Sequence, residues 1–162
     1  MKTITVTSIT AIFALFAAAD AVQAEKNNDT GFVVAENIIE AVNKIDIISL
    51  NVLLAEGAAV DTVDDAGNSP LILAAKIGNP RMIEILLAHN PEINRRNNNG
   101  DTALMIASEA GVLPIVESLT KAGADSDMRN SKGFSSAQIA QRYGHGSIAQ
   151  FLSGKQHVSF SR

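Results

Sequence analysis

Hydrophobic, small and turn residues recur along the chain with a period of 33 positions. The rows that keep this step are Ala41, Ala74, Ala107, Ala140; Leu53, Leu86, Leu119, Leu152; Gly67, Gly100, Gly133; and Gly78, Gly111, Gly144. Because several residue types share one spacing, the sequence predicts a stack of about four similar units. A single unit cannot bury its apolar stripe alone, so each must pack against its neighbours.

Each unit is predicted to form two short helices. Ser69 is suited to cap the first helix and Pro70 to occupy its first turn, while Gly78 allows a left-handed ending. The second helix places Met82 and Leu86 on one apolar stripe. The equivalent cap and turn positions in the later units are Thr102, Gly111, Ser135 and Gly144.

The repeated segments resemble a known repeat. Residues 64–79 (DDAGNSPLILAAKIGN) resemble the ankyrin repeat pattern D-x-x-G-x-T-P-L-H-x-A-A-x-x-G-H, and residues 97–112 and 130–145 repeat it with increasing drift. The chain resembles exported ankyrin repeat proteins of the bacterial type. The resemblance implies an all-α ankyrin repeat solenoid of about four helix-turn-helix repeats with short β-hairpin-like finger turns.

The two ends of the stack differ from its middle. The first repeat has Ile45 where the pattern expects glycine, and we interpret it as an N-terminal cap. The last repeat adds Gln138, Gln141 and Gln150, as expected of a polar C-terminal cap. It also holds most of the aromatic residues beyond residue 24, which either close the open end of the stack or, for Phe134 and Tyr143, contribute to a binding surface.

The beginning of the chain has the pattern of an export signal. Lys2 precedes an apolar run over residues 9–19, and Val22-Gln23-Ala24 offers small residues for cleavage. We therefore expect a signal peptide at 1–24, a linker at 25–33, an ankyrin repeat domain at 34–155 (34–63, 64–96, 97–129, 130–155) and a tail at 156–162. The protein is expected to be periplasmic or secreted, and the alternative is a retained membrane anchor.

Composition and charge narrow the function. The chain has 13 Lys and Arg against 17 Asp and Glu, a net charge of −4, and no cysteine, so it lacks thiolate metal ligands and disulfides. An acidic balance argues against a dedicated nucleic-acid binder. Binding of nucleic acid through Arg95, Arg96 and Arg129 stays as an alternative.

No motif for catalysis is convincing. Residues 144–149 (GHGSIA) match a dinucleotide fingerprint, but they follow a helix instead of a strand. His89, His145 and His157 fall in different layers, and His145 occupies the Gly-His position of the repeat, where a structural role is expected. We therefore expect no catalytic, metal or cofactor-binding residue and no enzyme activity. An enzyme with an unrecognised site is the open alternative.

The resemblance implies that a partner binds at the fingertips and the inner faces of the first helices. The matching candidates are Asp65, Asn68, Lys76, Ile77, Asn98, Asp101, Glu109, Lys132, Phe134, Arg142 and Tyr143. Ile77, Arg142 and Tyr143 are the first choices, because exposed apolar, aromatic and arginine side chains dominate binding energy.

The expected function is protein–protein interaction by a monomer that binds no cofactor, nucleic acid or, after signal removal, membrane. The favoured role is a periplasmic adaptor or stabiliser of another exported protein. The alternative is an immunity-type inhibitor that binds and blocks a toxin enzyme.

Overall fold

The computed structural model describes residues 37–156. The predicted signal peptide at 1–24 and linker at 25–33 lie outside the described residues, as does the tail beyond residue 156. Among residues 37–156, no helix combines the length and the apolar character needed to cross a membrane.

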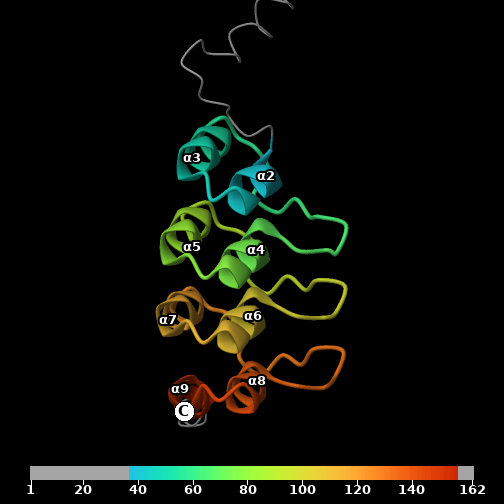
Figure 1. Ribbon diagram of the computed structural model, residues 1–162, viewed down its shortest axis with the longest axis vertical. Helices are drawn as coiled ribbons and strands as arrows, with labels where there is room; N and C mark the ends of the chain where they lie inside the picture. Colours follow the sequence, from blue (N-terminus) through green and yellow to red (C-terminus); the bar gives the residue numbers. More distant parts are fainter. Residues whose placement is uncertain (1–36, 157–162) are drawn as a thin grey trace, which may run out of the picture. The chain divides into compact units, whose positions relative to one another are not determined.

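The described residues form eight helices and no strands, and the helices follow one another in pairs. The helices are α2 (Ile38–Asn43), α3 (Ile47–Ala55), α4 (Pro70–Ile77), α5 (Pro80–Leu87), α6 (Ala103–Ala110), α7 (Leu113–Lys121), α8 (Ser136–Arg142) and α9 (Gly146–Gln156). Within residues 37–156 the pairs stack in four layers (Figure 1). Helices α2, α4, α6 and α8 pack in succession as an inner row, and α3, α5, α7 and α9 form the outer row. This arrangement confirms the predicted all-α repeat solenoid.

The helix ends follow the predicted capping residues. The Ser69 hydroxyl accepts a hydrogen bond from the Ile72 N–H at 3.4 Å, and Pro70 occupies the first turn of α4. Thr102 and Ser135 cap α6 and α8 in the same way. Gly78 ends α4 in the left-handed conformation with φ of 77°, which a residue without a Cβ adopts without strain.

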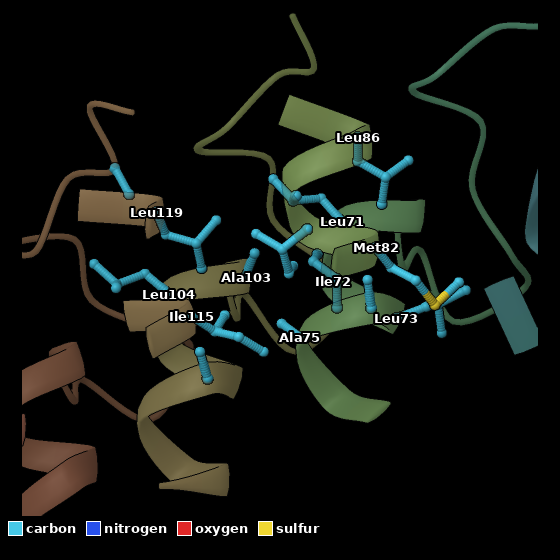
Figure 2. Close-up of a cluster of buried hydrophobic side chains, with 14 of the residues drawn as sticks. Leu71, Ile72, Leu73, Ala75, Met82, Leu86, Ala103, Leu104, Ile115 and Leu119 are labelled. Atoms are coloured by element: carbon cyan, nitrogen blue, oxygen red, sulfur yellow. The ribbon is translucent and has the colours of Figure 1, made fainter. Parts of the chain in front are cut away.

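The core is a continuous layer of aliphatic side chains between successive repeats. Figure 2 shows Leu71 of one repeat pointing toward Ile115 and Leu119 of the next repeat, whereas Met82 and Leu86 point toward the preceding repeat. All five are at most 2% exposed. Stacking neighbours therefore bury the apolar stripe that each repeat would expose on its own.

The first repeat departs from the expected N-terminal cap. Ile45 stands where later repeats have glycine and adopts φ of 57°, a conformation that β-branched residues rarely take. Ile45, Ile48 and Val52 are also exposed. The C-terminal end fits the expectation better, because Gln138, Gln141 and Gln150 are exposed, whereas Phe151 packs against the core.

Three finger loops connect α3 to α4, α5 to α6 and α7 to α8, and they project from the inner row of helices (Figure 1). Each tip is closed by the same two backbone hydrogen bonds. In the first finger, the Asp64 N–H donates to the Asn68 carbonyl and the Gly67 N–H donates to the Asp64 carbonyl, at 3.1 and 2.9 Å. The tips are therefore hairpin-like turns, as predicted, without assigned strands.

Candidate protein-binding groove

A groove of about 620 Å³ lies along the inner faces of α4, α6 and α8 and the finger loops beside them. Eight of the eleven predicted binding residues line it: Asn68, Lys76, Asp101, Glu109, Lys132, Phe134, Arg142 and Tyr143. The structure thus brings together residues that span more than 70 positions of the sequence. Whether they bind a partner stays a prediction.

The floor of the groove is apolar. It includes Ile72, Ile106 and Ile139, of which Ile72 and Ile139 are buried and Ile106 is half-buried. Sequence reasoning did not select Ile106 or Ile139. Helix periodicity could have found them, because each lies one turn before a predicted residue, Glu109 and Arg142 respectively.

The finger loops are joined by a ladder of amide hydrogen bonds that repeats from one finger to the next. The Asn97 side chain donates to the Asn68 side-chain oxygen at 2.9 Å, and one repeat later Asn130 donates to Asp101 at 2.8 Å. Backbone bonds alternate with these contacts, since the Asn98 N–H donates to the Ala66 carbonyl at 3.0 Å. The ladder holds the fingers in a fixed register, which preorganises the groove wall.

The carboxylate of Asp64 supports the first fingertip. Burial raises the pKa of Asp64, but hydrogen bonds from the Asn68 side chain and from the backbone N–H groups of Asn68 and Ala66 outweigh burial and hold the pKa below its ordinary value of 3.8. The charged form of Asp64 therefore stabilises the turn that presents Asn68 to the groove.

The arginines of the fingers are engaged in intramolecular bonds. Arg96 donates to the carbonyl oxygens of Gly100 and Arg129, at 3.0 and 2.9 Å, and so connects two fingers. Arg129 donates to the Gly133 carbonyl, and Arg95 forms an ion pair with Glu92. These groups serve the fingers themselves, which weakens the alternative that Arg95, Arg96 and Arg129 bind nucleic acid.

Aromatic and charged side chains gather at the end of the groove formed by the last repeat. The Arg142 guanidinium lies 5.2 Å from the centre of the Phe134 ring, within the range of a cation–π interaction. Tyr143 is 53% exposed, and a hydrogen bond to Glu109, together with the charge of that carboxylate, raises the pKa of the phenol. Phe134 and Tyr143 therefore line the groove, whereas Phe151 packs against the core.

Three predicted residues lie outside the groove. Ile77 is half-buried against the hydrophobic core, so it is not the exposed apolar position that we expected. The Asn98 side chain donates to the Asp65 carbonyl at 3.1 Å, so both residues take part in the ladder between fingers. Pattern matching alone does not separate these contacts from surface available to a partner.

His145 has the structural position expected of it. Its ring lies against Gly111, where an added Cβ would collide with the imidazole. One ring nitrogen lies 3.0 Å from the Glu109 carbonyl oxygen at the end of α6. The ring therefore packs the fourth repeat onto the end of α6 at a point where only glycine leaves enough space.

Within residues 37–156, no three His, Asp or Glu side chains gather closely enough to hold a metal ion. The groove combines exposed cations, aromatic side chains and an apolar floor.

The comparisons with known proteins agree with the repeat. The family model of ankyrin repeats (3 copies) matches residues 38–130 and again residues 91–160. The chain therefore belongs to the ankyrin repeat proteins, whose repeat arrays are typically non-catalytic scaffolds for protein–protein interaction. No curated protein matches the chain.

Proposed function

We propose that this chain is an exported adaptor or stabiliser that holds another protein in the groove beside α4, α6 and α8. The observation that supports the proposal is the exposed cluster of Arg142, Tyr143 and half-buried Phe134 beside an apolar floor. Aromatic and arginine side chains are the residues that most often carry binding energy at interfaces. The N-terminal export pattern supports a partner in the periplasm or outside the cell.

The fixed register of the fingers gives the proposal a physical basis. The amide ladder and the stacked core order the groove before a partner arrives, so less conformational entropy is lost on binding. The partner would then gain affinity mainly from the desolvated centre of the groove.

A capture experiment from the native compartment tests this function. The tagged protein should retain a specific partner, and Tyr143→Ala together with Arg142→Ala should reduce the recovered amount at least tenfold. The matched control is Arg81→Ala on the outer helix α5, where the exposed side chain does not line the groove. Equal recovery with both variants would contradict the assignment of the groove.

A further inference from the structure

The groove carries three positively charged side chains. Lys76, Lys132 and Arg142 are exposed and line the groove. Within the part of the chain that the structure describes, the salt bridges involve Lys44 and Arg95 and none of these three side chains. Three cations thus face one hollow in a chain whose net charge is −4.

The two carboxylates in the groove are already engaged. Asp101 accepts a hydrogen bond from the Asn130 side chain at 2.8 Å as part of the ladder between fingers. The Glu109 carboxylate interacts with the neighbouring Tyr143 phenol and raises its pKa. Both carboxylates therefore interact within the fold. Among the described residues, Lys132 forms no salt bridge, and Lys76 acts on the nearby Asp64 carboxylate only through its charge.

The positions of the cations suggest the spacing of their ligand. Arg142 lies over the Phe134 ring in the last repeat and Lys132 lies on the fingertip of the same repeat, whereas Lys76 lies two repeats away on α4. Packed helices are roughly 8–10 Å apart, so the two sites are separated by roughly 16–20 Å. An extended peptide covers this distance with about five or six residues.

We propose that the groove binds an extended acidic segment of its partner. One acidic residue lies next to an aromatic or large aliphatic side chain and meets Lys132 and Arg142, while the apolar side chain packs beside Phe134 and Tyr143. A second acidic residue, about five or six positions away, meets Lys76. This inference rests on the proposed function, because it names the chemistry of the protein that the groove holds.

Selection from random peptides tests the inference without knowledge of the partner. Twelve-residue peptides displayed on phage are selected on the purified full chain, and the enriched peptides are synthesised for affinity measurements. We expect enriched peptides with net negative charge and an apolar residue beside an acidic one, and we expect weaker binding at high salt. Enrichment of neutral or basic peptides, or of none, would overturn the inference.

Charge reversal locates the site. Lys76→Glu, Lys132→Glu and Arg142→Glu combined should weaken the acidic peptides at least tenfold, and Lys132→Glu alone, at an exposed fingertip, should weaken them severalfold. The matched control is Arg81→Glu with Lys121→Glu on the outer helices, which should leave affinity unchanged. Equal loss in the control, or no loss in the groove variants, would overturn the inference.

Two further outcomes separate this inference from the function on which it rests. If the enriched peptides are neutral or basic but bind the Tyr143→Ala protein more weakly than the wild type, the groove binds protein, and the inference of an acidic ligand is wrong. If acidic peptides bind equally to Tyr143→Ala and to the charge-reversed groove, both assignments fail. A 20-nucleotide single-stranded DNA that displaces the peptides from the groove and binds more tightly would assign the cations to nucleic acid and also overturn the inference.

Discussion

Ser136 gives a sharp test of the packing at the last repeat. It is the first residue of α8 and is 0% exposed, and its hydroxyl has no hydrogen-bond partner among the described residues. The equivalent positions of the two preceding repeats hold Pro70 and Ala103, which are also buried and carry no hydroxyl. We therefore expect Ser136→Ala to stabilise the protein.

The size of the effect follows from the burial of the hydroxyl. An unpaired buried hydroxyl costs about 1–3 kcal/mol, and the alanine gains a few tenths more from helix propensity. Part of this gain is lost because the missing oxygen leaves a small gap. The free energy of unfolding should rise by about 1–2 kcal/mol, which corresponds to roughly 4–8 °C in melting temperature for a domain of this size.

Thermal and urea unfolding followed by circular dichroism measure this change. The matched control is Ser108→Ala, because Ser108 is also 0% exposed but donates to the Leu104 carbonyl at 2.7 Å. Loss of that bond should cancel the gain in helix propensity or slightly exceed it, so Ser108→Ala should be neutral or mildly destabilising. A lower melting temperature for Ser136→Ala, or equal shifts for both variants, would refute the reasoning.

Three other predictions concern stability. Leu86→Ala removes a fully buried side chain and should lower the free energy of unfolding by about 2–5 kcal/mol, so an unchanged urea midpoint would contradict the stacking register. Gly144→Ala should lower the free energy of unfolding by about 1–2 kcal/mol, because Gly144 has a left-handed backbone. Gly111→Ala should lower it by at least about 1 kcal/mol more, because the added Cβ would also collide with His145. Equal melting temperatures for the two variants would contradict the packing of His145 against Gly111. The pKa of Asp64 is lowered in the folded state, so its charged side chain stabilises the fold. This contribution to the free energy of unfolding is present above the ordinary pKa of 3.8 and is lost as pH falls through the lowered value. Unfolding measured between about pH 5 and 2 should therefore show a smaller acid-induced loss of stability for Asp64→Asn than for the wild type, and identical losses would contradict this contribution.

The repeat period predicted the helices because the residues that end and cap them act locally. Ser69 and Gly78 fix the ends of α4 through contacts within one turn, and the same residue types recur 33 positions later. The stacking leucines were predictable for a related reason, since apolar periodicity identifies the face that must be buried. Leu53 is only half-buried, because the first repeat has no preceding repeat among the described residues.

The sequence predicted which positions lie at the groove, but it did not predict which of those side chains are engaged in contacts within the protein. Arg142 and Tyr143 line the groove as predicted. Ile77 instead packs against the core, because the last residue of α4 lies between the groove and the packing surface of the helix. The bonds between Asn97 and Asn68 depend on side chains 29 positions apart, and a row of asparagines in the sequence looks like an ordinary solvated tip. Lys76, Lys132 and Arg142 can be recognised as cations outside salt bridges only once the ion pairs among the described residues are known.

The most direct test of the binding groove is site-specific photocross-linking in the native compartment. A photoreactive phenylalanine analogue is placed at Tyr143 in the groove, and in a separate protein at Glu117, which is exposed on the outer helix α7. The groove position should give a discrete cross-linked protein that is lost when Lys132→Glu and Arg142→Glu are added, and the Glu117 position should give none. The same cross-link from both positions, or none from Tyr143, would contradict the assignment of this groove as the partner-binding site.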